Sequence, residues 1–313
     1  MVIPYMSTTI TFETLLDTSL SAVSNVNELK TALNKRMLSL VNDYEDGEWR
    51  YARFQSFLWD NIAETALSQK ERNALVGKGH TALVESAKNL RLTDSDKIGQ
   101  GSEIAEVFLY GVMKDHFGAL PVVPKIFYKQ NSQDNAKGAD SVHIVIKDDD
   151  FTLWFGEAKF YNSISDGRLD AIVNSVIESL RTDKLKKENS IVTNIFDIHD
   201  LEIPLDLKAK IIAAIQPRES IDNIKSKIHI PIMLLHECSI TSSNSIINKT
   251  YRDSLVTHHK DRAESYFKKQ ISASSPVFMY DEINFHVIFF PVPNKEKIVK
   301  AFIDGVSFYK GQA

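Results

Sequence analysis

The stretch that decides the fold is KGADSVHIVIKDDDFTLWFGEAKFY, residues 137–161. Two apolar runs flank the polar segment KDDD (147–150), a pattern that predicts a β-hairpin. Side chains of a strand alternate between its two faces, so Glu157 and Lys159 continue the apolar face of the second strand, and Asp140 continues an apolar face of the first. Charged residues where a strand interior normally carries Val or Ile indicate a functional site.

The pairing register of this hairpin decides whether the two acids meet. A turn with its midpoint between Asp148 and Asp149 places Asp140 directly opposite Glu157, whereas one extra loop residue would put the acids on a diagonal or on opposite faces. Directly opposed residues have Cβ atoms about 4.5–5.5 Å apart, and like charges there are destabilising. The two carboxylates therefore require a cation between them. Mg²⁺, which prefers oxygen ligands, suits this position, and we expect that Mn²⁺ can substitute.

Lys159 indicates which reaction the predicted metal site supports. It follows Glu157 by two residues on the same strand face, close enough to reach a bound water or a reacting phosphate. A metal ion lowers the pKa of its bound water, and an ammonium group stabilises the extra negative charge of a pentavalent phosphorus transition state. The pattern therefore predicts phosphodiester hydrolysis, with Asp140 and Glu157 as metal ligands and Lys159 as the charge-stabilising group.

Composition restricts the other possibilities. The chain has 313 residues, 43% of them hydrophobic, and a single cysteine, Cys238. It therefore has no internal disulfide framework and no cysteine-based zinc cluster, which favours a reducing, cytoplasmic location. No segment reaches the roughly 18 apolar residues of a membrane span, and the N-terminus lacks the basic region of a signal peptide, so no membrane association is expected. The formal net charge of −4 gives no overall attraction for DNA, so DNA binding requires a local basic patch or a partner.

Hydrophobic spacing divides the chain into two regions. Apolar residues recur at intervals of three and four from about residue 12 to 95, which predicts a helical N-terminal region over residues 1–95. Residues 96–313 are predicted to form a mixed α/β sheet flanked by helices. Besides the hairpin, the predicted elements are helices at 102–118, 165–183, 251–272 and 294–310 and strands at 121–129, 228–239 and 283–293.

These residues resemble the PD-(D/E)XK nuclease superfamily. The pattern is Asp140 in GAD, sixteen intervening residues, and then EAK, which contains Glu157 and Lys159. The proline of the family name is absent, because an alanine precedes Asp140. The resemblance implies a restriction-endonuclease-like core and a role for a glutamate of the upstream helix, which joins the metal site or steadies the lysine. Glu106 is the favoured candidate for this auxiliary acid, and Glu103 is the alternative.

A narrower resemblance concerns the strand GEAKFY, the helix after it, and the C-terminal segment FHVIFFPVPNKEKIVKAF. These are similar to the HamA family, the effector subunits of the Hachiman antiphage defence system, from about residue 95 to the end and less clearly over the helical N-terminus. The resemblance implies a DNA nuclease that works with a HamB-like superfamily-2 helicase. Because the chain is acidic, we expect the helicase to deliver the DNA. The predicted docking surfaces are the N-terminal region and the exposed face of the C-terminal helix near residues 298–303.

Other polar residues have weaker interpretations. Arg168, in the first turn of the helix after the EAK strand, is a candidate for DNA contact. Lys184 in the run KLKK is a second candidate, although such runs commonly complement a helix dipole and stay solvated. His236 and its neighbouring glutamate are more typical of a polar strand end than of a metal site. His258 and His259 are predicted to lie in a solvated helical turn.

Two alternatives remain beside the nuclease hypothesis. Glu157 and Lys159 alone are compatible with an ordinary surface ion pair on one strand face, because the D-x(16)-E-x-K pattern is short. A catalytically silent protein of the same fold, which docks on a helicase and regulates it, is the competing function. Cleavage of plasmid DNA with Mg²⁺ or Mn²⁺, with and without the helicase and ATP, distinguishes the nuclease from the catalytically silent protein.

Overall fold

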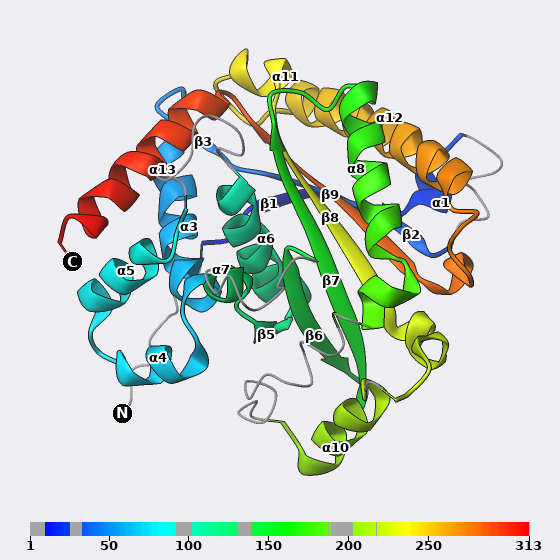
Figure 1. The fold of residues 1–313 in the computed structure, drawn as a ribbon. Coiled ribbons are helices and arrows are strands. Elements are labelled where there is room, and N and C mark those ends of the chain that lie inside the picture. The colour runs from blue at the N-terminus through cyan, green and yellow to red at the C-terminus, as the bar shows by residue number, and fades with distance from the viewer. Residues whose placement is uncertain are drawn as a thin grey trace, which may run out of the picture.

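A seven-stranded mixed sheet, ordered β1-β2-β9-β8-β7-β6-β5, forms the centre of the protein (Figure 1). The computed structural model describes residues 10–25, 33–91, 102–129, 139–186, 188, 203–216 and 218–312. The strands of the sheet are β1 (Glu13–Ser19), β2 (Lys35–Val41), β5 (Leu120–Val123), β6 (Ser141–Lys147), β7 (Asp150–Tyr161), β8 (Ile228–Glu237) and β9 (Asn284–Val292). Strands β2, β9, β8 and β7 are parallel, and β1, β6 and β5 extend the sheet by antiparallel pairing. The predicted mixed α/β class is confirmed.

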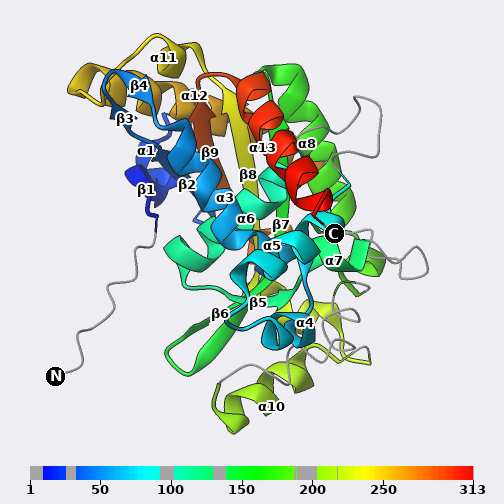
Figure 2. The same cartoon turned by 90° about the vertical axis from the view of Figure 1, so that its left-hand side faces the viewer.

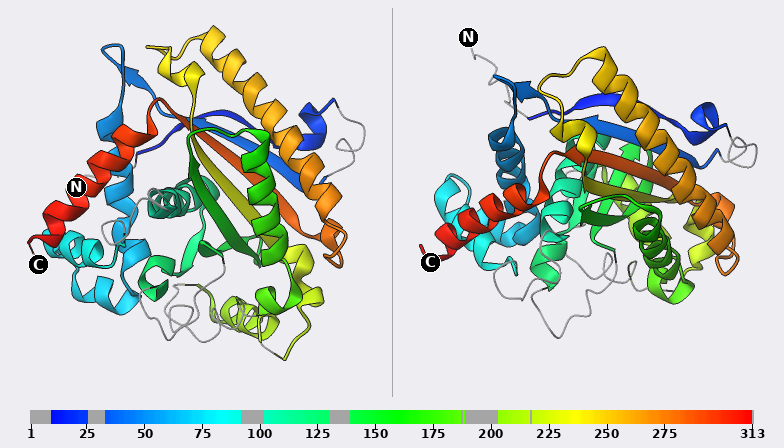
Figure 3. Two further views of the ribbon diagram at one scale, coloured as in Figure 1. Left: turned by 45° about the horizontal axis from the view of Figure 1, so that its top comes forward. Right: turned by 90° about the horizontal axis from the view of Figure 1, so that it is seen from above.

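Helices cover both faces of this sheet. The helices of the described residues are α1 (Leu20–Val23), α3 (Tyr51–Ala66), α4 (Gln69–Ala74), α5 (Gly79–Lys88), α6 (Ser102–Phe117), α7 (Lys125–Lys129), α8 (Asp166–Ser179), α10 (Leu205–Ala214), α11 (Ser239–Ser242), α12 (Lys249–Ala273) and α13 (Lys295–Lys310). A short hairpin, β3 (Tyr44–Glu45) with β4 (Glu48–Trp49), and two 3₁₀ helices, Ile221–Lys227 and Tyr280–Glu282, complete the described elements. Helices α8 and α12 pack on one face, and α3, α6 and α13 pack on the other (Figures 2 and 3).

The hairpin has the predicted register. Ser141 pairs with Gly156 and Lys147 pairs with Asp150, so the turn consists of Asp148 and Asp149 alone. Both turn residues have positive φ, 52° and 57°, as a type I′ turn requires, and this turn type matches the right-handed twist of the two strands. The odd-numbered side chains of β7 face α8 and α12, and its even-numbered side chains face α6.

The predicted helical character of the N-terminal region is only partly correct. Residues 51–66 and 79–88 are helical, but β1 and β2 occupy segments that were expected to be helices. Strand β2 lies between β1 and β9 and is buried along most of its length, so its sequence, KRMLSLV, does not show the regular alternation of a half-buried strand. Both strands belong to the same sheet as the hairpin. The predicted boundary between residues 95 and 96 lies outside the described residues.

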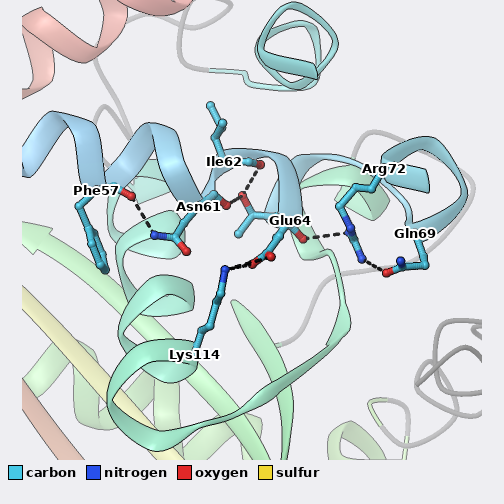
Figure 4. Close-up of polar contacts among 8 residues, drawn as sticks. Phe57, Asn61, Ile62, Glu64, Gln69, Arg72 and Lys114 are labelled. Carbon is cyan, nitrogen blue, oxygen red and sulfur yellow. Dashed lines mark hydrogen bonds and ion pairs between the residues drawn. The ribbon is translucent and has the colours of Figure 1, made fainter. Parts of the chain in front are cut away.

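Helix α6 is held against α3 by a close backbone approach at Gly111. A Cβ atom at this position would lie 2.5 Å from Cζ of Phe57. Beside this contact, Nζ of Lys114 on α6 lies 3.0 Å from a carboxylate oxygen of Glu64 on α3 (Figure 4). Helix α6 ends before Gly118, whose φ of 60° is the left-handed conformation in which glycine commonly terminates a helix.

Candidate active site

The site lies where β7 extends beyond its partner β6. Pairing of β6 with β7 reaches Ser141 and Gly156, whereas pairing of β7 with β8 continues to Tyr161. Beyond Gly156, side chains satisfy the backbone groups on the β6 side of β7: the Ala158 N–H donates to Oδ2 of Asp140 at 3.0 Å, and the Phe160 carbonyl accepts from a lysine. We call residues 158–161 of β7 the open edge.

Asp140, Glu157 and Lys159 meet beside this open edge. Nζ of Lys159 lies 2.5 Å from Oε1 of Glu157 and 3.6 Å from Oδ2 of Asp140. The side chains of Glu157 and Asp140 are 10% and 14% exposed, and that of Lys159 is 29% exposed. The three groups are therefore partly shielded from water and do not form an ordinary surface ion pair.

The charges of this cluster are unbalanced. Burial raises the pKa of Glu157, and the negative charge of Asp140 raises it further, although Lys159 partly opposes this. Burial disfavours the ammonium form of Lys159, but the two carboxylates outweigh this effect, so the pKa of Lys159 is raised and the group is cationic at neutral pH. Within the described residues of the cluster, two carboxylates share one ammonium group, a combination whose excess negative charge a divalent cation would neutralise.

Ser175 is a member of the site that sequence reasoning missed. Ser175 lies on α8, and its Oγ donates a hydrogen bond of 2.7 Å to Oε1 of Glu157. The hydrogen bond favours the ionised form of Glu157 and fixes the orientation of its carboxylate. The available signal was the position of Ser175 beside the apolar stripe of α8 that packs on the sheet, among Ile172 and Val176.

A buried ion pair holds the residue that precedes Asp140. Oε2 of Glu188 accepts from Nζ of Lys125 at 2.7 Å, and its Oε1 accepts from the N–H of Ala139 at 3.1 Å. The side chains of Lys125 and Glu188 are 2% and 5% exposed. Glu188 thereby fixes the backbone at the start of β6, and with it the position of Asp140. No sequence pattern linked these residues, which are far apart along the chain.

The two candidate auxiliary acids occupy different environments. Both carboxylate oxygens of Glu103 accept from the backbone N–H of Arg91, each at 3.0 Å. The carboxylate of Glu103 thus has a hydrogen-bond donor that does not belong to the charged cluster. Glu106 is buried, with 6% of its surface exposed, on the helix that covers the opposite face of β7 from Glu157. Among the described residues the ion-pair partners of Lys159 are Asp140 and Glu157. The role of Glu106 stays a prediction.

The two predicted DNA contacts are both exposed. Arg168 lies in the first turn of α8, with its guanidinium carbon 5.2 Å from the centroid of the Tyr161 ring. Lys184 lies on helical residues 182–186 next to the buried Leu185. The structure thus brings Arg168 to the end of β7, close to the open edge, and its contact with DNA remains to be tested.

His236 and His259 are buried and hydrogen-bonded to each other. His259, expected in a solvated turn, is fully buried because α12 packs on the sheet. Its Nδ1 lies 2.8 Å from Oγ of Ser39, and its Nε2 lies 3.1 Å from Nε2 of the buried His236. Within the described ranges, no three or more His, Cys, Asp or Glu side chains are grouped so that they could hold a metal ion. His236 therefore has hydrogen-bond partners but no set of co-ligands.

No helix in the described part of the chain is both long and apolar enough to cross a membrane. A search of curated proteins finds no match. The sequence model of the HamA family matches residues 17–306, which include the strands β2 and β5 to β9 and all three residues of the charged cluster. This range includes most of the N-terminal region, over which the similarity seen in the sequence is less clear. The chain therefore belongs to the HamA family, and this membership indicates a part in Hachiman antiviral defence.

Proposed function

We propose that this protein is a divalent-metal-dependent DNA nuclease that hydrolyses phosphodiester bonds as the effector of a Hachiman complex. The observation that carries the proposal is the cluster of Asp140, Glu157 and Lys159 at the end of the paired part of the hairpin. Its composition and order resemble the PD-(D/E)XK nucleases. The open edge beside it offers a place where a DNA strand can approach the three side chains.

The donor set fits Mg²⁺, with Mn²⁺ as a substitute. In nucleotide-processing sites Mg²⁺ is commonly bound by one or two carboxylates, with water and phosphate oxygens as the other ligands, and Asp140 and Glu157 supply two carboxylates. When bound, the ion would lower the pKa of a water molecule and neutralise charge on the phosphate. The raised pKa of Glu157 is consistent with a site in which a further cation is needed.

The protein groups have separable roles in this reaction. Asp140 is fixed by the Ala158 N–H and by the backbone contact of the preceding residue with Glu188. Ser175 orients Glu157. Lys159 can donate to the non-bridging oxygens of the phosphate as negative charge develops on them, since its ammonium group is held beside the two carboxylates. Glu106 is the proposed auxiliary acid.

Delivery of DNA is assigned to a partner. The formal net charge of −4 gives long-range repulsion from a polyanion, so a subunit that threads or grips DNA would raise the rate of capture. A HamB-like superfamily-2 helicase is the proposed partner, because the chain belongs to the HamA family. We expect weak, salt-sensitive DNA binding by the isolated chain and a large increase in cleavage when the helicase engages DNA.

Cleavage of plasmid DNA tests the proposal. Wild type, Glu157→Gln and Lys159→Met are incubated with Mg²⁺ or Mn²⁺, with and without the helicase and ATP. Glu178→Gln is the matched control, because Glu178 lies on the exposed surface of α8 and pairs with Arg181. We expect cleavage by wild type and the control only. If folded wild-type protein cleaves under none of these conditions, the protein acts as a catalytically silent scaffold that regulates the helicase.

A further inference from the structure

Two cations reach the open edge of β7 from opposite faces of the sheet. Nζ of Lys295, the first residue of α13, donates to the Phe160 carbonyl at 2.7 Å and lies 5.1 Å from the centroid of the Phe160 ring. Arg168, on α8, lies over the ring of Tyr161. Consecutive strand residues point to opposite faces, so the Phe160 and Tyr161 rings lie on opposite faces of the sheet. Each ring contacts one of the two cations, and both cations therefore lie near the same edge of β7.

The two helices begin on either side of the end of β7 (Figure 1). Helix N-termini carry partial positive charge and favour anions near their first turn. Arg168 and Lys295 each lie within such a first turn. Two formal charges and two helix dipoles therefore converge on the same short segment of strand.

The charges of Arg168 and Lys295 influence each other. Burial lowers the pKa of Lys295, and the positive charge of Arg168 lowers it further, while Glu237 opposes both. Oε2 of Glu237 accepts from the backbone N–H of Lys295 at 2.9 Å. In the described part of the chain no carboxylate forms an ion pair with either cation, and the hydrogen bond shown for Nζ of Lys295 goes to a carbonyl. An anion between the two cations would remove their repulsion.

The position of this pair relative to the charged cluster suggests which anion it binds. Tyr161 follows Lys159 by two residues on the same face of β7, a separation of about 6–7 Å along a strand. A nucleic-acid strand that places one phosphate at Lys159 would run along the open edge and bring a neighbouring phosphate to the cation pair. Guanidinium groups bind phosphate oxygens through two parallel N–H donors, and ammonium groups bind them as point charges.

We propose that Arg168 and Lys295 together bind a backbone phosphate of the DNA strand next to the phosphate that is cut. The inference rests on the proposed function, and it adds Lys295 and the open edge to the substrate-binding surface. The pair acts on binding and alignment of the strand, whereas Asp140, Glu157 and Lys159 act on the reacting phosphate. Because the contact is to phosphate, it carries no sequence preference.

Salt-dependent DNA binding tests the proposal without cleavage. Binding of a labelled single-stranded oligonucleotide is measured by fluorescence anisotropy in a Glu157→Gln background, for the chain alone and for its complex with the helicase. The variants are Arg168→Met, Lys295→Met and the double variant. Methionine keeps the aliphatic packing over Phe160 and Tyr161 and removes the charge. Lys297→Met is the control, because Lys297 lies on the same helix with its Nζ 3.8 Å from the centroid of the Tyr51 ring.

Each single variant is expected to weaken binding about tenfold, since it removes a charged hydrogen bond to phosphate. The slope of log K against log salt should become shallower by about 0.7 for each phosphate of a single strand that the variant no longer neutralises, and Lys297→Met should match its background. An affinity and slope of the double variant equal to those of Lys297→Met would overturn the inference. So would loss of helicase binding with unchanged DNA binding, which would assign the cations to a protein interface.

The two proposals fail separately. If wild type cleaves DNA and the double variant binds as the control does, only the cation pair is misassigned. If the double variant loses affinity and wild type never cleaves, the pair binds DNA in a protein that is not a nuclease. Thermal unfolding of every variant in parallel identifies a loss of fold, and a variant whose melting temperature matches that of Lys297→Met is used for the comparison.

Discussion

Mild acid is expected to destabilise this protein strongly, because the fold keeps five histidines, four of them buried and one partly buried, in their neutral form. They are His143, His229, His236, His259 and His286. Burial lowers the pKa of His143 and of His236 to about 3 and that of His229 to about 4. It also places the pKa values of His259 and His286 well below their ordinary range. The folded protein therefore binds protons at these sites only in strong acid.

The sign and size of the effect follow from proton linkage. In the unfolded chain these histidines bind protons as the pH falls below about 6.5, whereas in the folded chain they do not. Stability is therefore fully present at neutral pH and is lost as the pH falls. At about pH 5.5 each histidine costs about 1.4 kcal/mol, so five cost about 7 kcal/mol, comparable with the whole stability of a typical domain, about 5–15 kcal/mol. Glu157, whose pKa is raised, acts in the opposite sense.

Urea unfolding followed by tryptophan fluorescence, at about pH 7.5, 6.5 and 5.5, measures this loss. His143→Leu is the informative variant, because among the described residues neither imidazole nitrogen of His143 has a hydrogen-bond partner. It should flatten the pH profile by about 1.4 kcal/mol at pH 5.5. Exposed His80→Gln is the control. Equal stability at the two extreme pH values, or equal pH slopes for the two variants, would refute the reasoning.

Three further outcomes are expected. Mg²⁺ at about 100 times its dissociation constant should add about 2.7 kcal/mol of stability to wild type, measured as a rise in melting temperature, and an equal rise in Asp140→Ala/Glu157→Ala would contradict the metal site. Glu188→Gln should lower the free energy of unfolding in urea by about 3 kcal/mol, because it leaves the ammonium group of Lys125 buried without its counter-ion. The double variant Lys125→Met/Glu188→Gln should recover part of this loss. A double variant as unstable as the single one would argue against charge burial as the cause. Gly111→Ala should cost about 1–3 kcal/mol by the same measurement, since its Cβ would meet α3 at 2.5 Å, and an unchanged midpoint would show that α3 can move away.

The sequence by itself determined the hairpin and the charged cluster. Alternation with a period of two places side chains on faces, and a two-residue turn sets the pairing, so both are local properties of residues 137–161. Asp140, Glu157 and Lys159 were therefore identified, and their proximity is confirmed. The strands β8 and β9 were also predictable, because each is a long apolar run. The helices α12 and α13 were predictable too, since each is a long segment that begins at an asparagine N-cap.

The identity of β1 and β2 was decided by the tertiary structure. Short apolar runs fit a helix or a buried strand equally well by periodicity. Strand β2 is extended because its backbone groups pair with β9, which is more than two hundred residues away along the chain. Secondary structure set by such distant hydrogen bonds has no local signal, and for this reason the helical prediction of the N-terminal region was only partly correct.

The surroundings of the cluster also depended on the fold alone. Ser175, Glu188 and Lys295 reach the site from three different segments, each brought there by packing on one face or the other of the sheet. His259 is buried for the same reason, since α12 presses it against β2 and β8. Sequence spacing determines which residues share a face of one element, but burial, ion pairing and pKa depend on which other elements cover that face. The physical reason is that these interactions act through space over a few ångströms, independently of distance along the chain.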